Sequence, residues 1–255
     1  MALMPHLWSI FNFIMCFHYS ITQQLSKIAD VLRVNWDGEE WQPIYHADGF
    51  TFLKMPVITQ DHPSQIQLLN WGLIPSWIKT KTEADKIKSQ TLNARSETVF
   101  EKPSFRNSIK SQRCLIIADG FFEWMDFAKK KYPHYIYLKD RSVFCFAGIY
   151  ATWTDKETGE CMQTFSILTT VANPMMEKIH NLKKRMPVIL PQASYQSWLK
   201  KEITPKELSE LFNPFPESEM ANHTVGKMVN SRYDNNNIPE ILQPVTYPEL
   251  AFLSL

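Results

Sequence analysis

The chain has 255 residues, a formal net charge of +1 at pH 7 and only four cysteines. Hydrophobic residues make up 44% and charged residues 21% of the sequence, which allows a sizeable core and excludes an intrinsically disordered chain. The length fits one large or two small domains and excludes a multidomain assembly. No GxGxxG, GxxxxGKS or GxxxxGKT pattern occurs, so the common nucleotide-binding loops are not indicated.

The predicted elements begin with a helix at 20–34, where Leu25, Ile28 and Val31 fall at helical spacing after a Ser/Thr start. The middle of the chain is rich in β-branched and aromatic residues bounded by turn formers, which predicts strands. In chain order, the further predicted elements are a strand at 67–73, a helix at 104–111, strands at 113–119, 132–138, 143–153 and 164–171, and helices at 174–180, 194–201 and 205–212.

This order is irregular and does not alternate strand with helix, which favours an α+β fold. We expect a single domain over 16–255, with a curved, mainly antiparallel, distorted barrel-like sheet flanked by short helices. The segment from about 213, rich in Pro and Asn, is predicted to wrap over the domain in an extended form. Residues 1–15 are apolar but lack the cationic start and cleavage site of a secretory signal.

The cysteines form no CxxC pair, and the seven histidines show no HExxH spacing. Neither a disulfide framework nor a metal site is therefore expected, and a reducing cytoplasm is the expected location. No apolar run reaches the roughly 18 residues that a membrane span needs. The cysteines are Cys16, Cys114, Cys145 and Cys161.

Charge is unevenly distributed along the chain. Residues 79–113 contain nine Lys/Arg and four Asp/Glu, whereas residues 202–255 contain three and eight. A local cationic stretch can bind a polyanion such as DNA even in a nearly neutral molecule, because phosphate contacts act within a Debye length. A solvated surface without a partner is the alternative interpretation.

Polar and ionisable groups lie at several predicted strand ends and turns, where binding and catalytic residues often occur. These segments are, in chain order, Met15-Cys16, Trp71-Gly72-Leu73-Ile74-Pro75-Ser76-Trp77, Asn93-Ala94-Arg95-Ser96-Glu97-Thr98, Ala118-Asp119-Gly120-Phe121-Phe122-Glu123-Trp124, and Ile179-His180 leading to Arg185-Met186-Pro187-Val188-Ile189-Leu190. The co-linear series from Met15 to about Leu190 resembles the SOS-response-associated peptidase family, or SRAP domain. The order of the five motifs makes the resemblance specific.

The resemblance implies a DNA-repair activity of the SOS response: covalent capture of abasic sites in single-stranded DNA by an N-terminal cysteine. It further implies a monomer that needs no cofactor or metal, works on the nucleoid and does not act at a membrane. The chemistry is plausible for Cys16, because an abasic sugar opens to an aldehyde. An α-amine forms a Schiff base with it, and the nearby thiol closes a five-membered thiazolidine.

An internal cysteine has no α-amine, so Cys16 must be freed from the residues before it. Translation from Met15 followed by removal of that methionine is the preferred explanation, which makes 1–15 an upstream extension outside the mature protein. The alternative is cleavage of a longer chain, for which the family's peptidase label suggests the protein itself. The structural alternative for Cys16 is a buried small apolar side chain.

The resemblance also implies roles for four further residues. Asn93 would position the Cys16 terminus and the sugar, and Arg95 would bind phosphate, for which a guanidinium fork is suited. Glu123 lies between aromatic residues that can raise its pKa for acid–base work, sharing a strand face with Phe121. His180 would handle protons at the sugar ring oxygen. A surface ion pair of Arg95 with Glu97, a paired buried Glu and a capping His are the structural alternatives.

Three segments depart from the family pattern. The usual His-x-Arg-Met-Pro is lengthened by three residues between His180 and Arg185, which makes the position of His180 less secure. Phe17-His18 replaces the usual Gly-Arg pair after the cysteine, and 45–50 replaces an Ala-Pro segment facing the DNA. We expect these differences to change how the terminus and the strand are held.

Further DNA contacts are expected from apolar and basic residues. Trp71, Pro75 and Trp77 could form a wedge or stacking platform for unpaired bases, although a tryptophan is more often part of a core. The candidate backbone contacts are Lys79, Lys81, Lys86, Lys88, Lys102, Arg106, Lys110 and Arg113, with Lys183, Lys184 and Arg185 as a second group. Neutralising several phosphates predicts affinity that falls steeply with salt.

Two other functions fit parts of the sequence. A cysteine hydrolase acting on a peptide would use Cys16 with His180 as base and Glu123 as the orienting carboxylate. A non-catalytic single-stranded DNA-binding module would need only the basic stretch and the tryptophans. The hydrolase would work with residues still attached before Cys16, whereas the DNA-binding module would form no covalent product.

Overall fold

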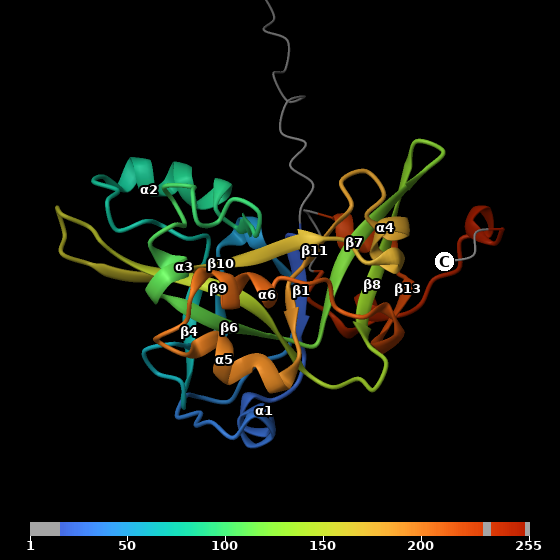
Figure 1. Cartoon of the computed structure of the whole chain (residues 1–255). Coiled ribbons are helices and arrows are strands. Elements are labelled where there is room, and N and C mark those ends of the chain that lie inside the picture. The colour runs from blue at the N-terminus through green and yellow to red at the C-terminus, as the bar shows by residue number, and fades with distance from the viewer. Residues whose placement is uncertain (1–15, 232–235, 253–255) are drawn as a thin grey trace, which may run out of the picture.

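The computed structural model describes residues 16–231 and 236–252. Within these ranges, thirteen strands and six short α-helices are joined by turns and 3-10 segments. The strands form an eight-stranded and a five-stranded sheet, and the helices lie around their outside (Figure 1). This agrees with the expected α+β domain with a barrel-like sheet. Residues 1–15 and the hypothesis about their removal lie outside the described residues.

The eight-stranded sheet closes on itself. β10 pairs with β4 on one side and β9 on the other, and the path from β4 through β3 and β6 returns to β9. Five strands therefore form a barrel, antiparallel except between β4 and β10. Its strands, with three short ones at its margins, are β3 (Lys54–Thr59), β4 (Ile66–Trp71), β5 (Asn93–Arg95), β6 (Arg113–Ala118), β9 (Phe144–Thr154), β10 (Cys161–Val171), β11 (Arg185–Pro187) and β12 (Ile189–Leu190).

The second sheet is antiparallel. One of its strands begins two residues after Cys16, and another contains Glu123. Its order is β13 (Met220–Thr224), β8 (Lys130–Leu138), β7 (Gly120–Phe127), β1 (His18–Ile21) and β2 (Ile44–Asp48). Gly120 opposes Ser20 in the β1–β7 pair. A Cβ at Gly120 would lie 2.1 Å from the Tyr135 hydroxyl, so only glycine lets that hydroxyl approach to 2.9 Å from the Ser20 hydroxyl.

The helices are short and lie on the surface. They are α1 (Leu25–Leu32), α2 (Lys81–Ile87), α3 (Ser108–Ser111), α4 (Pro174–Ile179), α5 (Tyr195–Leu199) and α6 (Pro205–Glu210). At the start of α2, Thr80 and Glu83 form a capping box that satisfies the first free N–H groups. No helix in the described ranges has the length and apolar character that crossing a membrane requires.

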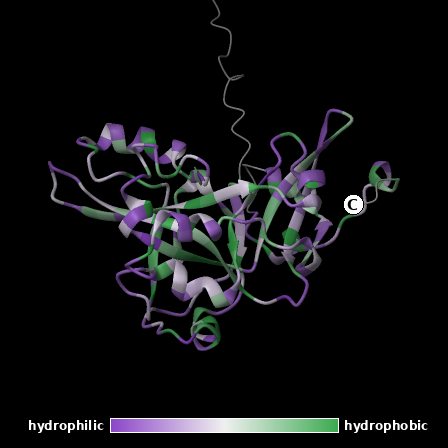
Figure 2. Ribbon diagram, in the orientation of Figure 1, coloured by the Kyte–Doolittle hydropathy of each residue, from purple (hydrophilic) through white to green (hydrophobic). Residues whose placement is uncertain are grey.

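The core fills the barrel and continues beneath the second sheet. Phe121, Phe146 and Phe165 are fully enclosed there. Hydrophobic residues concentrate on the central strands, and hydrophilic residues lie mainly on loops and outer helices (Figure 2). A smaller cluster around Phe122 and Tyr135 lies on the opposite face of β7. Phe121 and Phe122 thus belong to different clusters, as the predicted strand alternation requires.

The predicted strands at 67–73, 113–119, 132–138, 143–153 and 164–171 match β4, β6, β8, β9 and β10 to within a few residues at each end. The predicted helix at 20–34 is wrong at its start. Ser20 belongs to β1, because its hydroxyl donates to Asp119 Oδ1 at 2.6 Å and ties the segment to the second sheet. The helix begins only at Leu25 and ends where Arg33 adopts a φ of 57°.

The predicted helix at 104–111 is also too long, since only Ser108–Ser111 is α-helical. Sequence reasoning assigned no element to β2, β3, α2 or β13. The last of these lies in the segment after 213, where it pairs with β8 along its whole length.

Candidate active site

Cys16 lies at the entrance to β1 and is buried. The Asn93 side chain reaches it from β5, donating from Nδ2 to the Cys16 carbonyl oxygen at 3.0 Å. The other polar atom of that amide, Oδ1, is buried without a hydrogen-bond partner among the described residues. This hydrogen bond joins two residues that are 77 positions apart in the chain. It leaves Asn93 Oδ1 free to accept another hydrogen bond.

Glu123 and His180 form the second part of the site. Each side chain is only 1% exposed, and His180 Nε2 lies 4.0 Å from Glu123 Oε2. Neither carboxylate oxygen nor Nε2 has a hydrogen-bond partner among the described residues. Buried polar groups are normally hydrogen-bonded. Three buried polar atoms without a partner at one place therefore indicate side chains whose role is not to stabilise the fold.

The orientation of the histidine ring follows from its other nitrogen. His180 is the residue that ends α4, and its Nδ1 lies 2.9 Å from the Arg185 carbonyl oxygen. A carbonyl can only accept, so Nδ1 carries the proton and Nε2 is presented to Glu123.

The electrostatics of the site favour protonated rather than ionised groups. Burial raises the pKa of Glu123, an effect that the neighbouring His180 only partly offsets. Burial also raises the pKa of the Cys16 thiol well above its ordinary value, and the Glu123 carboxylate raises it further. A carboxyl group with a raised pKa can exchange a proton with its surroundings near neutral pH.

A guanidinium–carboxylate pair supports the site from β11. Both Nη atoms of Arg185 contact the Glu97 carboxylate, and Nη2 also donates to the Thr169 carbonyl oxygen at 2.6 Å. Partial burial acts to raise the pKa of Glu97, but the hydrogen bond and charge of Arg185 outweigh it and hold the pKa below its usual range. Arg185 is thereby fixed, and its carbonyl oxygen is fixed against His180.

The comparisons with known proteins agree on one family. A profile of the SOS response associated peptidase (SRAP) family matches residues 15–232. The abasic site processing protein YoqW of Bacillus subtilis is 36% identical over 90% of this chain and 99% of its own length. The abasic site processing protein HMCES of Gallus gallus is 30% identical over 80% of this chain and 67% of its own.

A crystal structure of a Bacteroides thetaiotaomicron protein superimposes with a TM-score of 0.85 at 38% identity, covering 91% of this chain and all of that one. This chain belongs to the SRAP family. The buried group of Cys16, Asn93, Glu123 and His180 takes one residue from each of four of the five motifs.

The lengthened SRAP motif after His180 is accommodated by a local turn. Lys184 adopts a φ of 51°, and its N–H donates back to the His180 carbonyl oxygen at 2.8 Å. The extra residues therefore project outward, and Arg185 resumes the strand beside β10. His180 still reaches Glu123, so the insertion changes the surface near the site but not the contact inside it.

The tryptophans of the second motif differ in exposure. Trp71 is 1% exposed, donates from Nε1 to the Leu92 carbonyl oxygen at 2.9 Å and stacks on Phe165. The prediction that Trp71 forms a DNA platform is therefore wrong for this structure, and Pro75 is buried as well. Trp77 is 51% exposed and is the accessible ring of the motif.

The expected backbone contacts also divide by exposure. Lys79, Lys81 and Arg106 are exposed, and Arg95 is more than half exposed while facing Glu97 at 3.6 Å. Arg185 is buried against Glu97, so a phosphate could reach it only by competing with that carboxylate. Arg113 is wrong as a DNA contact, because it is completely enclosed.

Sequence reasoning missed a stacked histidine pair beside the site. The rings of His18 and His46 lie 4.8 Å apart and nearly parallel, with Trp124 edge-on to His18. Burial lowers the pKa of His18 well below its ordinary value and also lowers the pKa of His46. The signal was present in the sequence, since both residues lie in segments that depart from the SRAP pattern.

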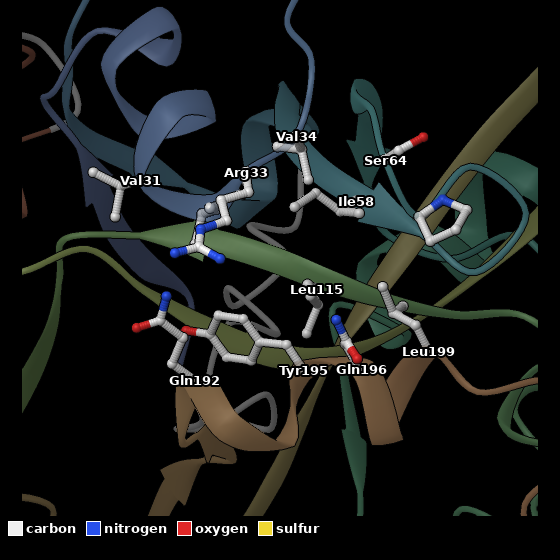
Figure 3. Close-up of a pocket in the computed structure, with 12 residues that line it drawn as sticks. Val31, Arg33, Val34, Ile58, Ser64, Leu115, Gln192, Tyr195, Gln196 and Leu199 are labelled. Atoms are coloured by element: carbon white, nitrogen blue, oxygen red, sulfur yellow. The ribbon is translucent and has the colours of Figure 1, made fainter.

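A cavity of about 620 Å³ lies away from this site, between α1 and α5. Figure 3 shows residues that line it, with Arg33 and Gln192 at the left of the view and the apolar side chains of Leu115 and Leu199 toward the centre and right. None of the four clustered residues lines it. In the described ranges, moreover, no group of three or more His, Cys, Asp or Glu side chains is arranged to hold a metal ion.

Proposed function

We propose that this protein captures abasic sites in single-stranded DNA as a covalent adduct on Cys16. The observation that carries the proposal is the convergence of four buried side chains in one incompletely hydrogen-bonded cluster. Asn93 bonds to Cys16, Cys16 interacts with Glu123, and Glu123 faces His180. The names of the relatives YoqW and HMCES, abasic site processing proteins, support the same lesion as substrate.

The reaction joins the ring-opened sugar aldehyde to a free α-amine on Cys16. The amine adds to the aldehyde and loses water to give a Schiff base, and the thiol sulfur then adds to the imine carbon. The thiol proton passes to the nitrogen, which closes the thiazolidine without any redox change. Since both nucleophiles belong to one residue, the second step is intramolecular and the adduct is durable.

The side chains around Cys16 would contribute to this reaction in different ways. Glu123, with its raised pKa, would carry the proton between sulfur and nitrogen. His180 would present Nε2 to the sugar ring oxygen, its tautomer held by Arg185. Asn93 holds the Cys16 carbonyl and has a free acceptor for the amine or the sugar, and the half-exposed Arg95 would bind phosphate.

The contacts of Cys16 favour aldehyde capture over peptide hydrolysis. A cysteine hydrolase needs a thiolate activated by histidine. Here burial and Glu123 both raise the pKa of the thiol, and the free nitrogen of His180 is directed at Glu123. Removal of the residues before Cys16 by the protein itself would be a separate, single-turnover activity of the same group.

The test compares chains expressed from Met15 and from Met1, each mixed with a single-stranded oligonucleotide that carries one abasic site. We expect a heat-stable crosslink from the Met15 form without borohydride, seen by denaturing gel and intact mass. Cys16→Ala should abolish it, and the matched control Cys161→Ala, which removes an exposed thiol, should retain it. If the chain with a verified Cys16 N-terminus leaves the lesion unmodified, the proposal is wrong.

A further inference from the structure

Two surface segments next to the candidate active site are joined into one unit. The Asn181 side chain donates from Nδ2 to the Asp126 carbonyl oxygen at 2.7 Å, and the Asp126 N–H donates to Asn181 Oδ1 at 3.0 Å. The turn at 181–184 is thus bound to the tip of the β7–β8 hairpin at 126–131. We refer to these two segments together as the lysine arm.

The lysine arm carries a concentrated positive charge. Its five lysines and one aspartate give a formal charge of +4. Lys131 lies 3.3 Å from Asp126, and Lys184 lies 3.8 Å from Glu177. The remaining lysines of the arm, Lys129, Lys130 and Lys183, are exposed and have no ion pair with a described residue. Their charge is available to a partner.

Apolar side chains are exposed among these lysines. Leu182 is 54% and Phe127 is 36% exposed. Alternating cations and apolar groups match a single nucleic-acid strand, whose phosphates repeat beside unpaired bases that stack on apolar and aromatic surfaces. An acidic peptide would be served by the charges alone, so the combination favours nucleic acid.

The arm also lies within reach of the reacting group. Asn181 directly follows His180, and Asp126 lies three residues beyond Glu123 on the same strand. At about 3.3 Å per strand residue, the hairpin tip is roughly 20 Å from Glu123. Figure 1 shows the hairpin and α2 on opposite sides of β1, the strand that begins two residues after Cys16.

We propose that the lysine arm binds the sugar-phosphate backbone of the strand on one flank of the abasic site, the flank opposite to that held near α2. This inference rests on the proposed function for the identity of the DNA, but it concerns binding and not the covalent step. It assigns a role to the three-residue insertion, whose Asn181 positions the arm.

The experiment uses the full Met15 form and measures binding separately from crosslinking. Lys129→Glu/Lys183→Glu is compared with Lys201→Glu/Lys206→Glu, a double reversal of exposed lysines elsewhere on the chain. Binding is measured by fluorescence anisotropy with two oligonucleotides, each bearing a reduced, unreactive abasic site. One extends about ten nucleotides only to the 5′ side of that site, and the other extends about ten nucleotides only to its 3′ side. Salt titrations and crosslink yields at saturating reactive DNA complete the comparison.

We expect the arm variant to lose about tenfold in affinity for one of the two extended oligonucleotides and little for the other, with the salt slope for the affected one reduced by about two. The control should bind both as the parent does. Asn181→Ala, which leaves every charge in place, should weaken binding to the same oligonucleotide by a smaller factor.

Equal losses on both flanks, or losses matching those of the control pair, would overturn the inference. Crosslinking separates the two proposals, because the arm variant should reach the parental yield once DNA is saturating. A flank-specific loss of binding in a protein that never crosslinks would support the arm and refute the proposed function. Crosslinking at the parental level without a flank-specific loss of binding would support the proposed function and refute the role of the arm.

Discussion

Arg113 and Glu123 are charged side chains ten residues apart on consecutive strands, and both are buried. Their surroundings differ. The Arg113 guanidinium donates through all three nitrogens, to the carbonyl oxygens of Ile109, Lys110, Trp198 and Lys200. The Glu123 oxygens have no hydrogen-bond partner among the described residues.

The difference separates a buried charge whose hydrogen bonds support the fold from a buried charge that the fold leaves without hydrogen-bond partners among the described residues. Arg113 satisfies the free carbonyls at the carboxyl ends of α3 and α5, where the helix dipole also favours a cation. Burial of the Glu123 carboxyl costs stability and raises its pKa, and the neighbouring His180 offsets that effect only in part. The fold therefore bears an energetic cost at Glu123, which the role proposed for this carboxyl in the chemistry of Cys16 would account for.

Replacing Arg113 should have the largest effect on stability. Arg113→Met removes the side-chain donor of the Ile109, Lys110 and Trp198 carbonyl oxygens and one of the two donors to the Lys200 carbonyl oxygen. It should lower the free energy of unfolding by about 3–5 kcal/mol. Urea denaturation monitored by tryptophan fluorescence measures it. Lys110→Met, on the exposed side of α3, is the matched control and should change stability by less than about 0.5 kcal/mol. Similar values for both variants would contradict the role given to Arg113.

Replacing Glu123 should separate stability from activity. A buried carboxyl with a raised pKa stabilises the fold only while protonated, and that stability is lost as the pH rises through the folded pKa. Glu123→Gln should therefore match or exceed the parent in thermal stability at neutral pH. Its single-turnover crosslinking rate should fall by about two orders of magnitude. A variant that crosslinks normally would remove Glu123 from the reaction.

The histidine stack makes stability sensitive to mild acid. Burial lowers the folded pKa of His18 and His46 below the unfolded value of about 6.5. Below that pH the unfolded chain binds protons that the folded chain cannot, so stability falls by up to roughly 1.4 kcal/mol per pH unit for each ring. The Asn236 side chain and Asp48 act in the opposite direction on the pKa of His46, so the share of His46 in this loss is smaller.

Urea denaturation at about pH 5.5 and about pH 7.5 measures this loss. His18→Gln should reduce the difference between the two conditions, whereas His62→Gln, at an exposed position, should leave it unchanged. An unaltered difference in His18→Gln would refute the contribution of the stack.

The two tryptophans of the second motif should give the smallest effect on binding and a clear contrast. Trp77→Ala should weaken binding of an intact single strand by about 1 kcal/mol, the lower end of the range for one stacked base. Its thermal stability should not change. Trp71→Phe should leave binding by the folded protein unchanged and lower its stability, since that ring is part of the core. Fluorescence anisotropy and thermal melts distinguish the two.

Strands of the barrel were predictable because their composition is decisive. The runs that became β6, β9 and β10 are rich in β-branched and aromatic residues and are buried on both faces. β2 and β3 lack so strong a local signal and form through pairing with β1, β4 and β6. The false helix start at Ser20 has the same cause, because Asp119, nearly a hundred residues away, holds Ser20 in a strand.

The residues of the candidate site were likewise predictable in type but not in their placement. Cys16, Asn93, Glu123 and His180 could be selected from motifs, because their residue types suit the chemistry. Their mutual placement could not be derived, and neither could the burial of Trp71 and Arg113, since exposure depends on which faces pack. Glu97 was identified only as a surface partner of Arg95, whereas it also holds Arg185.

The sequence by itself determined the family, four of the five barrel strands and the residue types of the candidate site, because these depend on local composition and on the order of short motifs. Tertiary structure alone decided which polar groups are satisfied and which are left unpaired. Hydrogen-bond partners such as the carbonyls around Arg113 come from segments distant in the chain. The functional contrast between Arg113 and Glu123 therefore exists only after the strands have closed around them.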